Sequence, residues 1–531
     1  MKKTLSVLLA LLLVMSIWSV ALIPVGAEET DAPSVWDGTA NIKWYFDGKA
    51  EGLGNYDLNS AADLAGLAYL VNASQSAACY TGVYYDANYD VLGYRLGSAD
   101  AAYADLSLIY TPTAGDGSQV TNGEAFTWQN VYLNVDVVLN EGNAADWATN
   151  PPTYKWQPIG GACGLSATKW YGFDGQFDGR GHTVSGMYVS YSLSTDALGV
   201  GLFGIIGYEV NAGVSNVTVE NFYAKSPWCA SGLIGRTKKL VAVDNCLVKN
   251  GYVVSDNDQT GALIGGAYNA ASITNCGVDN VSIKGADYIG GMIGVSVGYT
   301  IDVTDSYFIG SIECDYQLGV IVGRKKDGTI KLKNVYAIAE GVELAPGQKT
   351  ASMGTGVVYG FAADNSVVNV KAENYFYVQN LTAASGTVWD IGTTGTKEVT
   401  MAHLTGEMAK ATLNGFDFDT VWKTVENGTP VIELRGDEGG DENTDNNDNN
   451  NNDNNNENTN NNNNNQQSGD NTNQNDTTNK SDKTDKTETT AATTEATADE
   501  GKSGCGGVVG FSGLMLTAIL AGAAVMLKKE D

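Results

Sequence analysis

A short pattern recurs five times between residues 201 and 336, and this internal repeat constrains the fold more than any other feature of the chain. Each copy ends with two apolar residues and a glycine. The closing glycines lie 31, 30, 29 and 29 residues apart: Gly204, Gly235, Gly265, Gly294 and Gly323. A second column keeps the same period: Asn216, Asn245, Asn275, Asp305 and Asn334. Two columns with one period indicate a structural repeat of about thirty residues.

The segments between the two columns alternate β-branched and polar residues, as strands do, for example at 214–219 and 300–304. A unit of this length cannot bury its apolar side alone. Coils stacked ~4.8 Å apart bring each apolar position against its counterpart. We therefore predict an all-β fold, a right-handed parallel β-helix over residues 161–395. The repeated glycine supplies either a positive φ at a corner or room for close backbone approach.

The repeats resemble the GLUG motif of bacterial surface proteins, which is named for its Gly-Leu-small-Gly signature. Two upstream segments, 156–160 and the Phe-Asp-Gly-rich stretch 173–187, resemble the lead-in to such repeats. The resemblance covers roughly residues 35–435. It implies a secreted or cell-surface β-helix and does not imply one activity.

The N-terminal part predicts export and a cap. Residues 1–27 have two lysines, an apolar run and a small-residue cleavage site, as a signal peptide does. Residues 28–160 form a lead-in, in which we expect a helix at 61–72 that begins at a capping box on Ser60. This helix would cover the open end of the first coil. The tyrosine-rich stretch 79–115 lacks a clean period and predicts a loop excursion, and strand signal returns at 131–139.

The repeat ends in a C-terminal cap. A degenerate sixth copy with Gly360 and Asn374 follows the fifth. We predict a cap over 396–435, with a helix from Thr400 to Asn414 that ends at Gly415, and a last strand at 431–434.

Beyond the cap, the sequence predicts a stalk and an anchor. Residues 436–504 are rich in Asn, Asp and Thr and carry sixteen acids and four lysines, which predicts disorder. The uncharged apolar run 508–527 is long enough to span a membrane, and lysines in the tail 528–531 favour a cytoplasmic C-terminus. The chain is therefore expected at the cell surface, in the plasma membrane with one pass. It lacks a Leu-Pro-x-Thr-Gly sorting signal, so membrane anchoring is favoured over covalent attachment to the wall.

The cysteine and charge content limits the chemistry. Cysteines within the repeats are expected to fill the core, although stacking leaves a disulfide between Cys246 and Cys276 open. Lipid modification of Cys505 is also open. The net charge of −30 argues against a nucleic-acid partner. No cofactor is indicated, and no calcium-loop string occurs in the folded part.

Three kinds of function remain. A carbohydrate-active enzyme would need clustered carboxylates, for which Asp174, Asp178, Arg180 and His182 are candidates; Asp-Gly pairs are first of all turn signals. The favoured prediction is a non-enzymatic adhesin or binding module on a wall-spanning stalk, with an extracellular glycan or protein as partner. A structural surface-layer role is a third possibility. The candidate ligand contacts are tyrosines of the excursion, which would instead complete the cap if they pack inward: Tyr84, Tyr85 and Tyr89.

Overall fold

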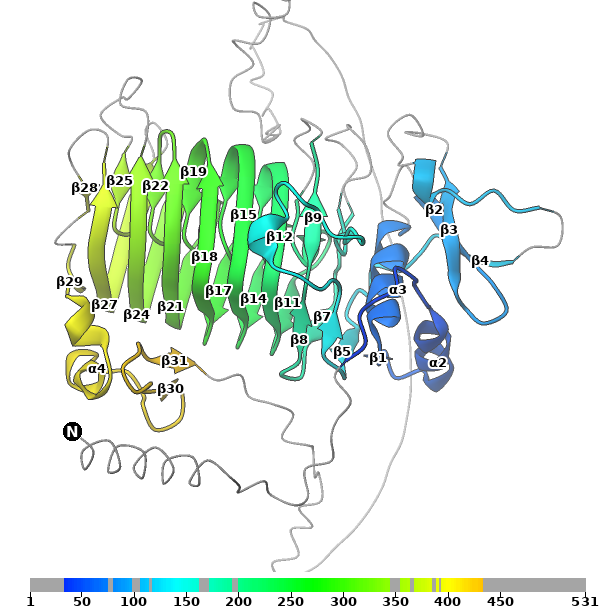
Figure 1. Cartoon of the computed structure of the whole chain (residues 1–531), viewed down its shortest axis with the longest axis horizontal. Helices are drawn as coiled ribbons and strands as arrows, with labels where there is room; N and C mark the ends of the chain where they lie inside the picture. The colour runs from blue at the N-terminus through cyan, green and yellow to red at the C-terminus, as the bar shows by residue number, and fades with distance from the viewer. Residues whose placement is uncertain are drawn as a thin grey trace, which may run out of the picture. The chain divides into compact units, whose positions relative to one another are not determined.

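The computed structural model describes residues 33–432, apart from 75–79, 98–105, 114–116, 162–170, 193–198, 344–353, 363–366, 384–387 and 391–392. The predicted signal peptide, stalk and apolar segment 508–527 lie outside the described residues. Within the described ranges, no helix has the length and apolar character needed to cross a membrane. The described chain is mostly β and is dominated by parallel sheets whose strands come from successive coils (Figure 1).

The repeated glycines stack in one parallel sheet of six strands. Its strands, in order, are β10 (Phe203–Ile206), β13 (Ile234–Thr237), β16 (Ile264–Ala267), β20 (Ile293–Val297), β23 (Val322–Lys326) and β26 (Tyr359–Ala362). Phe203 pairs with Ile234 and Ile205 with Arg236, so Gly204 lies directly beside Gly235. The same register continues through the other copies to Gly360. The stacked solenoid and its degenerate sixth copy are confirmed.

The other strands of the coils form a second, larger parallel sheet. Its strands are β1 (Asn55–Leu58), β5 (Asn130–Leu133), β6 (Val137–Val138), β7 (Gln176–Asp178), β8 (Thr183–Ser185), β9 (Tyr188–Ser190), β11 (Ala212–Ser215), β12 (Thr218–Ala230), β14 (Val241–Asp244), β15 (Leu247–Thr260), β17 (Ala271–Thr274), β18 (Gly277–Gly285), β19 (Asp287–Gly290), β21 (Ile301–Cys314), β22 (Leu318–Gly319), β24 (Gly328–Glu343), β25 (Thr355–Gly356), β27 (Val368–Thr382), β28 (Val388–Trp389) and β29 (Thr396–Glu398). Because β1 and β5 pair in parallel with each other and β5 pairs with β7, the coils begin well before residue 161.

The repeated glycines serve close backbone approach. None of the five predicted positions has a positive φ. A Cβ on Gly265 would lie 2.6 Å from the carbonyl carbon of Cys229 and 2.6 Å from the carbonyl oxygen of Gly235. On Gly294 it would lie 2.4 Å from the backbone nitrogen of Thr260. Of the two roles that the sequence left open, the structure therefore selects room for a neighbouring coil.

Left-handed backbone belongs instead to the asparagine column. Asn216, Asn245 and Asn275 have φ values of 53°, 53° and 52°. The corresponding φ values are 45° at Asp305 and 51° at Asn334. Asn and Asp tolerate this conformation better than other residues with a Cβ. Side-chain amides also bond from coil to coil, as when Asn245 Nδ2 donates to Asn216 Oδ1 at 2.7 Å.

Apolar side chains and thiols fill the interior of the coils. Cys229, Cys246, Cys276 and Cys314 are free and buried, which confirms their predicted core role. Cys246 is stacked on Cys276, since the residues on either side of the two pair in register. Burial raises the pKa of the Cys246 thiol well above its ordinary value.

Two helices pack at the N-terminal end. Helix α3 (Ala61–Asn72) has the predicted bounds, and Ser60 Oγ accepts from the backbone N–H of Asp63 at 3.1 Å. Its Leu64, Leu67 and Val71 are buried in the main core. Helix α2 (Lys43–Glu51) was not predicted. The residue at its N-cap, Ile42, makes no side-chain capping bond. The capping bond comes from Asn41, one position earlier, whose Oδ1 accepts the N–H of Lys43 at 2.9 Å, a signal that the sequence analysis missed.

The tyrosine-rich stretch is a small sheet, and the prediction of a loop excursion is wrong. Strand β2 (Tyr80–Tyr85) pairs antiparallel with β3 (Val91–Leu96) and with β4 (Ser118–Thr121). Asp86 closes the turn between β2 and β3, since its Oδ1 accepts the N–H of Asn88 at 2.8 Å and of Asp90 at 3.0 Å. The sequence of these strands does not alternate cleanly between apolar and polar residues, because bulges interrupt the pairing of β2 with β3.

The C-terminal segment covers the outer side of several coils. It contains η4 (Met401–Leu404), α4 (Glu407–Thr412), and the antiparallel pair β30 (Trp422–Lys423) and β31 (Val431–Ile432). The single helix predicted from Thr400 to Asn414 is wrong in extent. Gly406 interrupts it with φ 57°, and its N–H donates to Gly428 O at 2.9 Å instead of to a helical partner. Trp422 is buried against the stacked rings of Tyr307 and Tyr336.

Candidate functional site

An open groove of about 640 Å³ lies on the outer face of the larger sheet. The groove arises where strands that bend lie beside strands that do not. β12, β15 and β18 each bend at a left-handed asparagine, with φ 50° at Asn221 and 52° at both Asn250 and Asn280. β21 has one residue fewer here, because Asp279 pairs with Ile309 and Val281 with Gly310. The bent coils therefore meet straight ones, and both kinds line the groove.

A row of four side chains follows the groove from coil to coil. Tyr252 pairs with Ser282, Ser282 with Ser311, and Ser311 with Glu340. At ~4.8 Å per rung this row spans roughly 14 Å. It presents one aromatic ring, two hydroxyls and one carboxylate in sequence along the solenoid axis.

The bend asparagines add a row of amides. Asn280 Nδ2 donates to Asn250 Oδ1 at 2.8 Å, and Asn250 Nδ2 donates to Glu220 Oε1 at 2.9 Å. Each of these donations uses one of the two amide hydrogens. Asn250 and Asn280 are both exposed. Their second hydrogens therefore face solvent as donors for a ligand.

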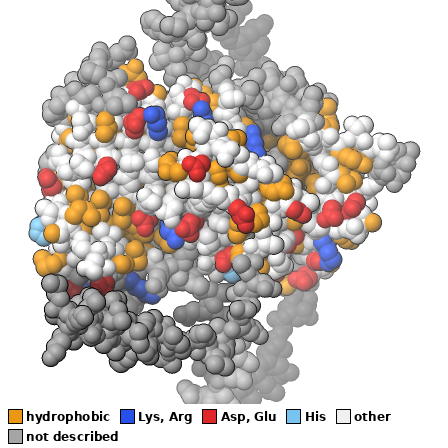
Figure 2. All heavy atoms as spheres, viewed as in Figure 1, with side chains coloured by type: hydrophobic (Ala, Val, Ile, Leu, Met, Phe, Trp, Pro, Cys, Tyr) orange, Lys and Arg blue, Asp and Glu red, His pale blue; other side chains and the backbone are white. Residues whose placement is uncertain are grey.

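Both sides of the groove are held by packed segments. On one side η3 (Ala144–Asp146) is fixed by the N–H of Ala144, which donates to Asn221 Oδ1 at 3.0 Å. On the other side Ile309 and Ile338 line the groove and pack against the C-terminal segment. In Figure 2, hydrophobic side chains gather at the corner where Figure 1 draws α4, and acidic side chains are dispersed over the rest of this face. The groove is thus preformed, between fixed walls.

The two aspartates first considered for catalysis stabilise different turns. Asp174 Oδ1 accepts from the backbone N–H of Tyr208 at 2.5 Å and of Glu209 at 3.1 Å. Asp178 Oδ1 accepts from the backbone N–H of Arg180 at 2.8 Å. Arg180 has a left-handed backbone with φ 48°. The carboxylates of Asp174 and Asp178 therefore do not converge, and the turn interpretation fits.

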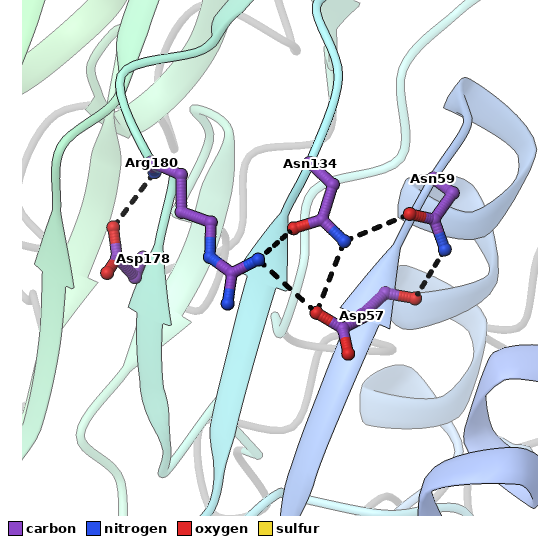
Figure 3. A network of polar contacts seen from close by, with 5 residues as sticks. All are labelled: Asp57, Asn59, Asn134, Asp178 and Arg180. Atoms are coloured by element: carbon purple, nitrogen blue, oxygen red, sulfur yellow. Dashed lines mark hydrogen bonds and ion pairs between the residues drawn. The ribbon is translucent and has the colours of Figure 1, made fainter. Parts of the chain in front are cut away.

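Arg180 belongs to a polar network that ties the first coils together (Figure 3). Arg180 Nη1 donates to Asn134 Oδ1 at 2.6 Å and lies 3.6 Å from Asp57 Oδ1. Asn134 Nδ2 in turn donates to Asp57 Oδ1 at 3.2 Å and Asn59 Oδ1 at 2.9 Å. His182 Nδ1 lies 3.1 Å from Asp136 Oδ1. These contacts give the network a structural role in joining β1, β5 and β7.

Two of the three predicted ligand tyrosines, Tyr85 and Tyr89, pack onto the cap. The rings of Tyr85 and Tyr89 are stacked at 5.7 Å, and each lies 5.2 Å from Phe46 of α2. Tyr84 contacts Tyr110 at 5.6 Å. Their role as ligand contacts stays a prediction, and these contacts favour the alternative in which the tyrosines complete the cap.

Sequence reasoning missed a carboxyl pair on adjacent coils. Asp258 of β15 pairs with Asp287 of β19, and the two are 29 residues apart, which is one repeat. Burial raises the pKa of Asp287 to about 7, while the Arg324 guanidinium opposes the rise. Both aspartates precede a glycine by three residues, so the repeat period could have revealed the pair. In the part of the chain that the structure describes, no group of three or more His, Cys, Asp or Glu side chains is placed to hold a metal.

Comparisons with known proteins add little. No family model matches the sequence, and no curated protein matches it. Among solved structures, the chain is similar to a Bacteroides ovatus protein that is provisionally described as an immunoglobulin A1 protease. The identity is 18%, the TM-score is 0.39, and the match covers 58% of this chain and 86% of that chain. A similarity at this level does not identify a function.

Proposed function

We propose that this chain is a non-enzymatic binding protein of the cell surface and that its groove binds an extended glycan. The observation that carries the proposal is the double row of ligand groups along the solenoid axis: amides at Asn250 and Asn280 beside the row from Tyr252 to Glu340. Aromatic rings and side-chain amides are groups that suit sugar rings and hydroxyls.

A glycan suits this surface better than a peptide strand. Extended peptides bind by adding to an exposed sheet edge through main-chain bonds. The groove lies on the face of the sheet, where β15, β18, β21 and β24 already pair with one another. Only side chains are available here, which favours a ligand that is read through its hydroxyls and ring faces.

The family, the handedness and the anchoring belong to the same proposal. Six stacked glycines support membership of the GLUG-motif surface proteins. The general preference for right-handed crossovers between parallel strands favours a right-handed β-helix. Residues 436–504 would form the stalk and 508–527 the membrane helix. Protease added to intact cells should then release the solenoid as a soluble fragment, whereas uncut protein recovered from the cytosol would contradict this topology.

Filling the groove tests the binding proposal. We expect Ser311→Trp, which places a large ring on the groove floor, to abolish binding of the full chain in detergent to its ligand on a glycan array. Ser272→Trp is the matched control, because Ser272 is an exposed serine of β17 that does not line the groove. Equal binding by both variants would refute the groove as the site.

An enzyme that cleaves glycans is the second candidate, and the backbone spacing of the Asp258–Asp287 pair favours it. Asp258 is buried and neither aspartate lines the groove, so such a site would lie apart from the groove. Retaining glycosidases hold two carboxyl groups ~5–5.5 Å apart, close to the rung spacing of ~4.8 Å. One carboxyl with a raised pKa would serve as the acid, and Asp287 has the raised pKa. Release of new reducing ends from a polysaccharide panel, abolished in Asp287→Asn, would support this alternative over simple binding.

A further inference from the structure

We propose that the glycan carries a free, protonated amino group and that Glu340 binds this group at one end of the groove. The inference rests on the proposed function and specifies its ligand. A sugar ring would stack on Tyr252, hydroxyls would meet Ser282 and Ser311, and the amine would meet the carboxylate. An oligomer of glucosamine has this chemistry.

Glu340 is distinguished by its lack of a cationic partner. Among the described residues, two neighbouring glutamates on this face are paired: Glu220 lies 3.6 Å from Lys249, and Glu313 lies 2.5 Å from Lys284. Glu340 is exposed, has no ion pair in the described part of the chain, and lines the groove. Its carboxylate is therefore available to a ligand.

The rest of the lining is neutral, so Glu340 sets the sign of the ligand charge. The other polar side chains of the groove are amides and hydroxyls. Two acids border the amide row. Glu220 accepts from Asn250 Nδ2 at 2.9 Å. Asp279 is next to Asn280 in the chain; burial raises the pKa of Asp279, and the charge of Lys249 opposes the rise. Lys249 is engaged by Glu220. A polyanionic chain such as a uronic-acid polymer would meet repulsion at Glu340 without a compensating cation in the groove.

The position of Glu340 gives the ligand a direction. The carboxylate lies three rungs, roughly 14 Å, from the Tyr252 position. An oligosaccharide with a ring on Tyr252 and an amine at Glu340 must therefore span several sugar units, and a single amino sugar cannot reach both. Affinity should rise with oligomer length up to this span.

The test compares a glucosamine hexamer with the N-acetylglucosamine hexamer, in which the amine is neutralised. We expect the full chain in detergent to bind the glucosamine hexamer roughly twofold to fivefold more tightly, the range for an exposed ion pair. Glu340→Gln should remove this preference and leave binding of the N-acetylated hexamer unchanged. Glu373→Gln is the matched control, because Glu373 is an exposed glutamate of β27 that does not line the groove. This variant should keep the preference for the glucosamine hexamer.

Each other outcome overturns part of the proposal in a recognisable way. Binding of both hexamers with equal affinity, or a preference that survives Glu340→Gln, refutes the role of Glu340 and leaves the glycan groove standing. If neither hexamer binds but another glycan on the array does, the proposal that the ligand carries an amino group is also refuted. Displacement of the glucosamine hexamer by hexalysine, without displacement by the N-acetylated hexamer, would assign the site to cationic peptides.

Discussion

Replacing Gly265 with alanine should destabilise the solenoid, although the change adds only one methyl group. The new Cβ would meet backbone atoms of the preceding coil at 2.6, 2.6 and 2.9 Å, distances that real Cβ atoms do not adopt. Backbone cannot rotate away as a side chain can, so the coils must separate locally. Overpacking of this kind costs ~1–3 kcal/mol, and contact with backbone favours the upper end. We expect the free energy of unfolding to fall by about 3 kcal/mol.

The control is Gly354→Ala. A Cβ on Gly354 would meet no heavy atom within 4 Å beyond the glycine's chain neighbours. Alanine restricts the unfolded chain, so this variant should be neutral or more stable by up to ~1 kcal/mol. Urea unfolding, monitored by tryptophan fluorescence, measures the free energy of unfolding of both variants. If Gly265→Ala matches wild type within ~0.5 kcal/mol, close coil approach is not the reason for the repeated glycine.

Three further predictions concern the coils and the cap. Asn245→Ala should lower the free energy of unfolding by about 2–3 kcal/mol, because alanine is strained in the left-handed backbone and the hydrogen bond to Asn216 is lost. Asn245→Gly loses only the hydrogen bond and should lower it by about 1 kcal/mol. Urea unfolding measures both variants, and equal losses would show that the φ of 53° does not matter. The folded-state pKa of Asp287, about 7, is above its unfolded value, so its stabilisation is complete below pH ~4 and is lost as pH rises to about 7. Asp287→Asn should therefore flatten this fall in thermal stability between pH 4.5 and 7.5, and an unchanged pH profile would refute the raised pKa. Replacing Tyr84, Tyr85 and Tyr89 together with serine should lower the melting temperature by several degrees if they complete the cap; lost ligand binding at an unchanged melting temperature would instead support a binding loop.

The repeat allowed much of the fold to be predicted. Two columns with one period fix which residues stack, because coils of equal length can bury their apolar positions only in register. The helix at 61–72 was also recognisable, since Ser60 and the apolar spacing are local signals. The antiparallel sheet around Tyr80–Tyr85 was not, because its pairing joins distant strands and contains bulges.

The groove lay beyond the reach of sequence reasoning. The bend asparagines Asn221, Asn250 and Asn280 keep the repeat period in the sequence. The groove also depends on the register shift between Asp279 and Val281, which is seen only when two coils are paired. Its walls come from η3 and the C-terminal segment, which are far from the groove strands in the chain. The same holds for the turn residues Asp174 and Asp178. They are neighbours in sequence, yet their hydrogen bonds lead to different partners.

The sequence by itself determined that the chain forms stacked parallel coils, because a thirty-residue period in two columns, with strand-like segments between them, buries its apolar positions by stacking. Only the tertiary structure decided what each column does. A glycine can serve either a left-handed turn or a close contact, and the choice depends on what lies opposite it in space. For Gly265 that is the backbone of the preceding coil, and the left-handed turn falls to Asn275.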